Sequence, residues 1–270
     1  ILRALPPLFD WQTLDSSLAP SAIFLDANNL YTFNSSNNSI YVFHIGSKKG
    51  EKLSIASSGV STLRSFVGKS DAEFIFYDDI GNLASLDLKS QKIIRKETDS
   101  SLKDRILTAY ANKIYSLNLI NNQIYKHNKT LTGFSKGDGW LKEDAISASD
   151  AVSMSIDSNI WILKKNGEIL KLFKGKREAF TLAIDPALKS PIKINAEADE
   201  KFLYILDAGI FGTGTSRFIA INKNSGEAAE KQYNFPELTN LLDFAIAEKN
   251  LYLLNGSIIY EVKLDDIATK

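Results

Sequence analysis

The stretch AVSMSIDSNIWILKKNGEILKLFKGKREAFTL, residues 151–182, decides the fold because it reads as four short strands joined by tight turns. Within it, the apolar residues Val152, Met154 and Ile156 alternate with Ser153 and Ser155. This is the period of two of a strand whose side chains point to two different faces. An Asn-Gly pair at 166–167 favours a tight hairpin. The expected strands are 151–156, 160–163, 168–173 and 177–182. A sheet of this size cannot bury both faces alone, so it must stack against copies of itself.

Copies of this unit recur along the whole chain at intervals of about 41 to 49 residues, a period typical of propeller blades of four strands. The second strand of each unit combines aliphatic and aromatic residues, at 29–33, 73–77, 113–117, 159–163, 202–206 and 250–254. The sequence therefore predicts an all-β fold, a six-bladed β-propeller of four-stranded antiparallel blades that forms one domain over residues 1–270. The expected blades are approximately 21–56, 62–97, 104–135, 151–182, 191–233 and 240–264.

The last unit lacks a fourth strand, because only residues 265–270 follow Leu264. We expect a strand from residues 1–15 to complete this blade and close the ring, since closure removes an exposed sheet edge. Two segments are candidates for that strand, residues 1–5 and residues 11–14. Pro6 and Pro7 disfavour a helix between them.

Composition narrows the classes of partner. Lys plus Arg and Asp plus Glu number 32 each, so no basic excess indicates binding to nucleic acid or to an anionic membrane. The chain has no cysteine, which excludes disulfides, thiol catalysis and cysteine-ligated zinc. No apolar run approaches the roughly 20 residues that span a bilayer, so we expect no membrane insertion of this piece. Because the sequence starts at Ile1, we interpret it as an excised or processed piece of a larger protein, whose parent can carry an export signal or an anchor that was cut away, and we expect a monomer.

Motifs for catalysis or metal binding are scarce. The sequence contains no G-x-S-x-G, H-E-x-x-H, P-loop or EF-hand pattern. The two histidines, His44 and His127, fall on different third strands at non-equivalent positions, so we interpret them as blade residues and not as ligands. We predict no catalytic residue, no metal and no cofactor.

The candidate binding residues follow the second strands or lie in two insertions. Equivalent positions lie around one face of a propeller, so carboxylate and amide oxygens there can converge on a cation or polar ligand. The structural alternative is that Asn and Asp are favoured in hairpin turns. Insertions at 133–150 and 207–216 mark a possible binding side, since loops added to repeat proteins often do. The candidates are Asn34, Asp78, Asn118, Lys164, Asp207 and Asn255 in the ring, with Trp140 and Phe211 in the insertions.

The repeat resembles six-bladed propellers of the NHL or YWTD general type, although no Trp-Asp dipeptide, kelch Gly-Gly, sialidase Asp-box or intact Y-W-T-D occurs. A further resemblance rests on Gly139-Trp-Leu-Lys142, Asn166-Gly-Glu-Ile-Leu-Lys171, Leu203-Tyr-Ile-Leu-Asp207 and Leu251-Tyr-Leu-Leu-Asn-Gly256. These segments are similar to C-terminal propellers of uncharacterised candidate-phylum bacterial proteins. In those proteins the propeller can follow a transmembrane helix, sometimes behind a protein-phosphatase-like domain, so the resemblance implies an extracytoplasmic sensor or adhesive module.

Three functions stay open. The first is a non-catalytic binding or sensor module that presents a propeller face to a protein, peptide or glycan partner. The second is a metal-assisted hydrolase or lactonase with a central cation, which needs carboxylates on the innermost strands. The third is a glycosidase, but no pair of carboxylates stands out by spacing. The innermost strands offer mainly Ser153, Ser155, Lys193, Asn195, Asp243 and Ala245. This low carboxylate density favours the binding module.

Overall fold

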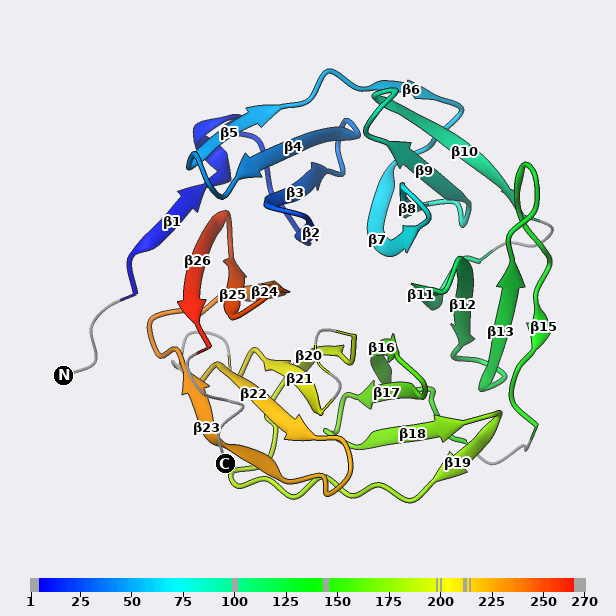
Figure 1. The fold of residues 1–270 in the computed structure, drawn as a ribbon, viewed down its shortest axis with the longest axis vertical. Helices are drawn as coiled ribbons and strands as arrows, with labels where there is room; N and C mark the ends of the chain where they lie inside the picture. Colours follow the sequence, from blue (N-terminus) through cyan, green and yellow to red (C-terminus); the bar gives the residue numbers. More distant parts are fainter. Residues whose placement is uncertain are drawn as a thin grey trace.

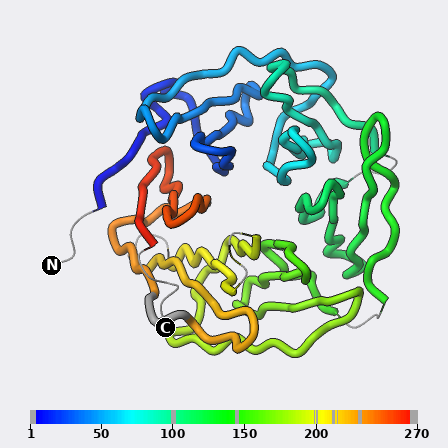
Figure 2. Tube along the Cα trace, viewed as in Figure 1, coloured from blue at the N-terminus to red at the C-terminus, as the bar shows by residue number. Residues whose placement is uncertain are grey.

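The computed structural model describes residues 5–98, 102–142, 146–197, 199, 201–210, 213 and 215–264. These residues form six sheets arranged as blades around one axis, which confirms the predicted six-bladed β-propeller (Figure 1). The chain runs once around the ring, so that blue and red segments meet where it closes (Figure 2). Among the described residues, no helix is long and apolar enough to cross a membrane.

In blades 1 to 5 the strands follow in chain order from the centre of the ring outward, and in blade 6 the outermost strand is β1 (Figure 1). Blade 1 contains β2 (Phe24–Asp26), β3 (Asn29–Asn34), β4 (Ser39–His44) and β5 (Lys49–Lys52), and blade 2 contains β7 (Leu63–Ser70), β8 (Glu73–Asp78), β9 (Leu83–Asp87) and β10 (Lys92–Thr98). Blade 3 contains β11 (Arg105–Tyr110), β12 (Lys113–Asn118), β13 (Gln123–Asn128) and β15 (Asp138–Gly139), and blade 4 contains β16 (Ala151–Ile156), β17 (Ile160–Lys164), β18 (Ile169–Phe173) and β19 (Lys176–Glu178). Blade 5 contains β20 (Pro191–Asn195), β21 (Phe202–Asp207), β22 (Arg217–Asn222) and β23 (Ala228–Asn234), and blade 6 contains β24 (Leu241–Ala247), β25 (Asn250–Asn255), β26 (Ile258–Lys263) and β1 (Pro7–Asp10).

Strand β1 closes the ring by pairing antiparallel with β26, where Phe9 lies opposite Ile259. The closing strand was predicted, but both proposed segments were wrong. Residues 11–13 form a 3-10 turn, residues 1–4 lie outside the described residues, and the strand falls between the two. Pro7 is tolerated because it is the first residue of an edge strand. The Phe9 ring stacks on Phe43 of blade 1 at 4.6 Å, so the closure also joins blade 6 to blade 1.

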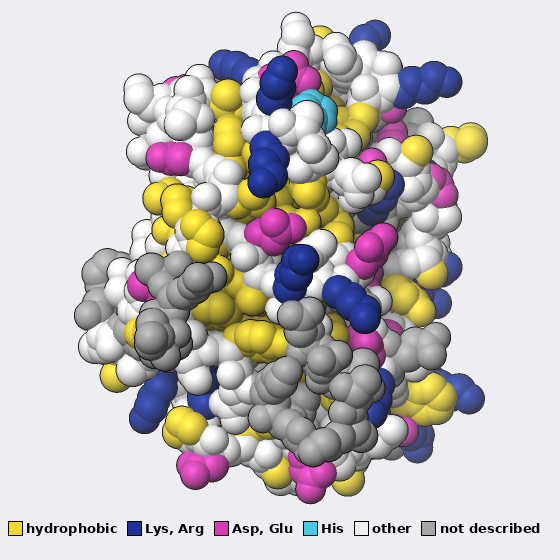
Figure 3. All heavy atoms as spheres, turned by 60° about the vertical axis from the view of Figure 1, so that its left-hand side comes forward, with side chains coloured by type: hydrophobic (Ala, Val, Ile, Leu, Met, Phe, Trp, Pro, Cys, Tyr) yellow, Lys and Arg dark blue, Asp and Glu magenta, His cyan; other side chains and the backbone are white. Residues whose placement is uncertain are grey.

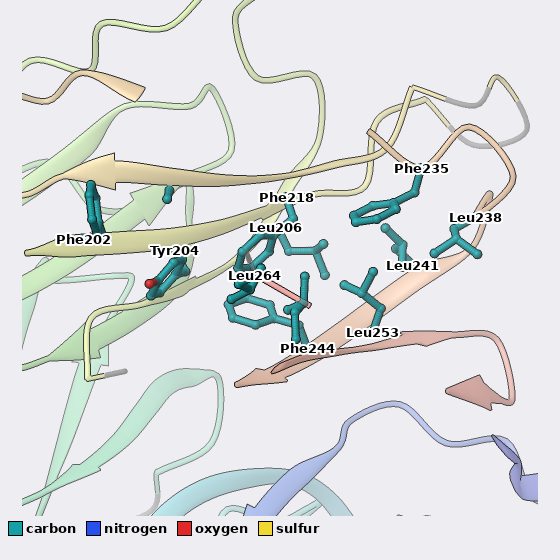
Figure 4. Close-up of a cluster of buried hydrophobic side chains, with 12 residues drawn as sticks. Phe202, Tyr204, Leu206, Phe218, Phe235, Leu238, Leu241, Phe244, Leu253 and Leu264 are labelled. Carbon is teal, nitrogen blue, oxygen red and sulfur yellow. The ribbon is translucent and has the colours of Figure 1, made fainter. Parts of the chain in front are cut away.

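Apolar faces of adjacent blades form the core. Between blades 5 and 6, the rings of Phe218 and Phe244 meet edge to face at 5.1 Å (Figure 4). Between blades 1 and 2, Phe24 stacks on Phe66 with ring centroids 4.4 Å apart. Such aromatic pairs contribute about 0.5–1.5 kcal/mol beyond the area that they bury. The aromatic residues that recur at one position of the second strands lie in these clusters: Tyr31, Tyr115, Trp161, Tyr204 and Tyr252.

The alternating strand directions give the ring two distinct faces. The hairpins that join second to third strands all lie on one face, together with the beginnings of the first strands. We call this face the hairpin face. The opposite face carries the connections from first to second strands and from third to fourth strands.

The outer strands differ from the prediction in two places. In blade 4 the fourth strand was expected at 177–182, but β19 ends at Glu178. The chain then leaves blade 4, and Ala183 forms a parallel bridge with Glu227 of blade 5. The insertion after blade 3 also contributes β14 (Gly133–Phe134), which pairs with β10 of blade 2. A further short strand, β6 (Ala56–Ser58), pairs with β10 as well.

Candidate functional site

The six polar residues predicted to form a ring end the second strands of their blades, all on the hairpin face. Asp78 and Asp207 are almost completely buried, at 1% and 0% exposed. Asn34 and Lys164 are buried too, and Asn118 and Asn255 are half-buried. The ring is therefore largely covered by its own hairpins.

Three ring residues turn the chain at the start of their hairpins. The side-chain Oδ1 of Asn34 accepts a hydrogen bond from the amide of Ser36 at 2.9 Å. The Oδ1 of Asp78 accepts in the same way from Ile80, at 3.2 Å, and that of Asn118 from Ile120, at 2.9 Å. This is the Asx turn, in which the side chain replaces a backbone acceptor two residues before the donor. These oxygens are engaged in building the hairpins.

The other ring residues bind neighbouring segments. Lys164 forms ion pairs with Asp150 at 3.1 Å and with Glu168 at 2.9 Å. The hydrogen bond to Glu168 raises the pKa of Lys164 above its usual value, and this effect outweighs the opposing effect of burial. Asn255 accepts a hydrogen bond from the amide of Asn240 at 2.8 Å.

Asp207 is the centre of a buried network in blade 5. Its carboxylate accepts hydrogen bonds from the amides of Lys189, Ser190 and Gly209, and an ion pair from Arg217 at 3.1 Å. Arg217 also donates to the carbonyls of Pro186 and Ala187 at 2.6 and 2.7 Å. The network fastens the connection between blades 4 and 5.

The Asx turns present the side chain two residues later to solvent, and in blades 2 and 3 that side chain is an isoleucine. Ile80 is 58% exposed and Ile120 is 89% exposed. Two further exposed apolar residues lie on the hairpin face, Ile210 in the blade 5 hairpin and Leu242 near the start of β24. Sequence reasoning missed these residues, although an isoleucine two positions after the ring residue was a visible signal.

The two candidates in the insertions lie in different situations. Trp140 is half-buried, packs against the apolar cluster of blades 3 and 4, and donates its backbone amide to the carbonyl of Ile124 at 2.7 Å. Phe211 lies outside the described residues. Neither observation tests whether these side chains bind a partner, so both stay predictions.

Polar side chains of the innermost strands tie adjacent blades together. The hydroxyls of Ser153 and Ser155 on β16 accept hydrogen bonds from the amides of Ile194 and Ala196, at 3.2 and 2.9 Å. Lys193 of β20 forms an ion pair with Asp243 of β24 at 2.5 Å. The same Asp243 accepts a hydrogen bond from the amide of Ile23 at 2.9 Å. Blades 4, 5, 6 and 1 are thus joined in series around the centre.

On the opposite face, Asp157 and Lys223 form an ion pair at 2.7 Å that links blades 4 and 5. Glu197 lies near this pair. Although Glu197 has solvent access, the surrounding protein removes part of the water from its carboxyl group, and this desolvation raises its pKa to about 7. The negative charge of Asp157 raises the pKa further, whereas the positive charge of Lys193 lowers it. This is the most strongly raised carboxyl pKa among the described residues, and a single raised carboxyl does not make a catalytic pair.

Both histidines lie on third strands, where they were predicted. His127 of β13 is fully buried, its Nδ1 donates to the carbonyl of Ser135 at 2.8 Å, and its Nε2 accepts from the hydroxyl of Ser116 at 2.9 Å. Burial lowers the pKa of His127, so the neutral form is favoured. Within the described ranges, no group of three or more His, Cys, Asp or Glu residues is arranged to hold a metal ion.

A pocket of about 420 Å³ opens at the rim of the ring between blades 4 and 5. One side is formed by the β17–β18 hairpin, by Ile169 and by Arg177. The other side is formed by the segment that leaves blade 4 after β19, residues 180–188. Ligand pockets commonly have volumes of about 300–1,000 Å³. The pocket was not predicted, because it lies where β19 ends at Glu178 and the chain leaves blade 4, four residues before the expected end of that strand.

Charges of both signs are mixed on the face of the molecule drawn in Figure 3. In the view of Figure 3, acidic and basic side chains alternate, with hydrophobic side chains visible between them. This mixture agrees with the formal net charge of zero.

Comparisons with known proteins identify the fold and no more. No protein-family model and no curated protein sequence matches the chain. Among solved structures, the calcium-binding protein regucalcin of Agrobacterium tumefaciens strain C58 is similar with a TM-score of 0.61 and 13% identity, over 96% of this chain and 93% of that one. A chain of the nidogen/laminin complex is similar with a TM-score of 0.60 and 12% identity, over 83% of each chain.

A third similar structure is the extracellular domain of BT4673 from B. thetaiotaomicron, with a TM-score of 0.57 and 12% identity. The similarity covers 99% of this chain and 38% of that one. These similarities agree with the six-bladed β-propeller fold, which was predicted. Fold alone does not fix function, because propellers of this class serve several.

Proposed function

We propose that this chain is a non-catalytic binding module that docks a protein partner on its hairpin face. The observation that carries the proposal is the set of exposed aliphatic side chains on that face, led by Ile80 and Ile120 on adjacent blades. Exposed apolar side chains on a rigid, polar-rimmed surface are typical of protein contacts. They favour a protein or peptide over a glycan.

The hairpins that carry these side chains are held in place before any partner arrives. Asp78 fixes its hairpin through the amides of Ile80 and Asn82, the latter at 2.7 Å, and Asn118 fixes the next one through Ile120 and Asn121. A contact surface that is already ordered loses little conformational entropy on binding. This is the physical advantage of a propeller face as a docking platform.

The alternative of a metal-assisted hydrolase or lactonase has weaker support. Its reaction needs several carboxylates free to converge on a central cation. The inner carboxylate of Asp243 is instead engaged by Lys193 and by the amide of Ile23. The similarity to a calcium-binding propeller is one of fold, at 13% identity.

We further propose an extracytoplasmic location, as part of a larger membrane-anchored protein. The support is the similarity to the extracellular domain of BT4673, which spans 99% of this chain. A surface-exposed module with a protein-binding face would serve as a sensor or adhesive domain.

The test is selection of displayed random peptides on the immobilised protein, on the double variant Ile80→Ser/Ile120→Ser, and on Leu131→Ser. Leu131 is a matched control because it is fully exposed but follows the end of β13, on the opposite face. Burying an isoleucine contributes about 1.5–3 kcal/mol, so each hairpin substitution should weaken a selected peptide about tenfold or more.

We expect peptides selected on the unmodified chain to bind Leu131→Ser equally and to be lost on the double variant. Equal binding to all three proteins, or no enrichment on any of them, would contradict the proposal. A separate measurement of thermal unfolding with added Ca²⁺ tests the metal-assisted hydrolase or lactonase. A metal that binds the native state would raise the midpoint of thermal unfolding.

A further inference from the structure

The end of the insertion that follows β13, residues 135–139, lies over blade 3, and we call it the strap. It begins after β14, which pairs with blade 2 and carries the buried side chain of Phe134. The strap is held by a short ladder, in which the amide of Ser135 donates to the carbonyl of Asn128 at 2.9 Å and β15 pairs with β13 over two residues (Figure 1). Residues 136, 138 and 139 are exposed. A segment held in this way opens at a lower free energy than the whole ring unfolds.

The strap covers the side chain of His127, which is fully buried. Gly137 lies against the imidazole, since a Cβ at this position would come within 2.5–3.0 Å of three ring atoms, Cε1, Nδ1 and Nε2. Only a residue without a side chain fits so close to the ring, and the φ of 95° at Gly137 also favours glycine. The strap and the imidazole therefore fit one another only while both keep their places.

Both ring nitrogens of His127 are used in a way that requires the neutral form. Nδ1 lies 2.8 Å from the carbonyl of Ser135 in the strap, and a carbonyl can only accept, so Nδ1 carries the proton. Nε2 is then the acceptor for the hydroxyl of Ser116, at 2.9 Å. The oxygen of Ser116 in turn accepts from the guanidinium of Arg105 at 3.2 Å. A proton added to Nε2 would take away the acceptor that the Ser116 hydroxyl uses.

The groups of blade 3 around His127 act against an imidazolium while the strap is closed. Burial is the largest effect and lowers the pKa of His127, whereas the hydrogen bond to Ser135 raises it. The positive charge of Arg105 lowers the pKa, and the negative charge of Asp138 in β15 raises it. The balance is a pKa below the usual value of about 6.5.

Across the seam between the blades, blade 2 contributes a charged pair. Ile114, directly opposite His127, packs in one cluster with Ile75 of β8. Glu73 lies two residues from Ile75, on the same face of β8, and forms an ion pair with Lys96 at 3.0 Å. These two charges largely cancel, so the groups of blade 3 itself decide the charge state of the imidazole.

We propose that the strap is an acid-sensitive clasp, in which a proton taken up by Nε2 of His127 breaks the bond from Ser116 and releases residues 135–139 from β13. The proton comes from water, and the imidazolium becomes hydrated as the strap lifts. Opening uncovers the outer edge of β13, whose amides and carbonyls then become available to another strand. The clasp lies apart from the exposed isoleucines of the hairpin face, and either can exist without the other.

The size of the response follows from the uptake of one proton. With the strap open, His127 has its ordinary pKa of about 6.5, and with the strap closed its pKa is lower. Between these two values the open fraction rises about tenfold for each pH unit of acidification. Above about pH 6.5 neither state binds the proton, so the open fraction is constant there.

The test measures hydrogen exchange of single backbone amides by nuclear magnetic resonance, with each rate divided by that of an unstructured peptide at the same pH. The readout is the amides of Ser135 and Trp140, which donate to the carbonyls of Asn128 and Ile124. We expect their protection to fall about tenfold or more between about pH 7.5 and pH 5. The amide of Phe235, which donates to the carbonyl of Ser216 in blade 5 at 3.0 Å, is the reference and should not lose protection.

Two pairs of variants separate the clasp from other effects of acid. His127→Gln stays neutral, so its protection should no longer depend on pH, whatever its overall stability. His44→Gln is the matched control and should keep the full response, because His44 is the other histidine on a third strand and lies at the surface. Gly137→Ala should open the strap already at about pH 7.5, whereas Gly139→Ala, whose Cβ would meet Gln123 at an ordinary 3.5 Å, should leave it closed.

Three results would each overturn the proposal. The first is that Ser135 and Trp140 keep their protection in acid, and the second is that His127→Gln loses it to the same extent as the unmodified chain. The third is that the amide of Phe235 loses protection in step with the strap, which would show that acid loosens the whole ring and not one segment.

Discussion

Replacing Arg217 with Leu should be strongly destabilising, because it leaves the buried carboxylate of Asp207 without its ion pair. Arg217 is 3% exposed and Asp207 is 0% exposed, so water cannot easily replace the lost partner. Removing one member of a buried pair typically costs about 3–5 kcal/mol. Arg217→Leu also frees the carbonyls of Pro186 and Ala187. We expect the free energy of unfolding, measured with urea, to fall by about 3–5 kcal/mol. The fall should not be larger, because backbone amides remain hydrogen-bonded to the Asp207 carboxylate.

In a chain of this size the change should lower the midpoint of thermal unfolding by about 6–20 °C. The matched control is Arg95→Leu, since Arg95 is exposed and its bond to Asn82 at 3.0 Å lies at the surface. That variant should stay within about 0.5 kcal/mol of the unmodified chain. The double variant Asp207→Asn/Arg217→Leu should be more stable than the sum of the single changes predicts. A loss below about 1 kcal/mol for Arg217→Leu would refute the reasoning, because an uncompensated buried charge cannot be that inexpensive.

Two further predictions concern the ring closure and its pH dependence. A Cβ at Gly50 would lie 2.4 Å from the Phe9 ring, so Gly50→Ala should displace β1, lower the free energy of unfolding by about 1–3 kcal/mol and speed amide exchange at residues 8–10. Gly46→Ala should do neither, because a Cβ there meets nothing within 4 Å. If exchange at β1 is unchanged in Gly50→Ala, the described closure is wrong. The raised pKa of Glu197, about 7, means that the folded chain holds a proton that the unfolded chain has already lost. Stability should therefore fall as pH rises from about 4.5 through 7, and Glu197→Gln should remove that part of the fall in urea titrations at several pH values. A Glu197→Gln profile parallel to that of the unmodified chain would show that this carboxyl does not titrate as described.

The blade pattern could be predicted from the sequence because its signals are local. Alternating side chains and turn residues such as the pair at 166–167 act over a few positions, and the first three strands of each blade follow them closely. The ring of polar residues was located for the same reason, since each member directly ends a strand. The structure supports the turn-forming interpretation of Asn34, Asp78 and Asn118 through their bonds to nearby amides.

Features that depend on distant partners could not be predicted. The closing strand was misplaced because its position is set by β26 and by the fit of Phe9 against Phe43, not by local propensity. The fourth strand of blade 4 was drawn too long because Phe180 packs edge to face on Trp161, with ring centroids 5.1 Å apart, instead of continuing the ladder. The rim pocket follows from that departure.

The pairing of β1 with β26 also has a consequence for how the chain is made. The hydroxyl of Ser257 donates to Asp10 across 247 positions of sequence, so the partner of β1 is synthesised long after β1 itself. At about 5–20 residues per second, β1 waits roughly 12–50 s for it. During that time Phe9 and Trp11, which pack together in the finished ring, have no completed blade 6 to cover them. A nascent chain of this kind is a natural client for chaperones that bind exposed aromatic segments until β26 has been synthesised.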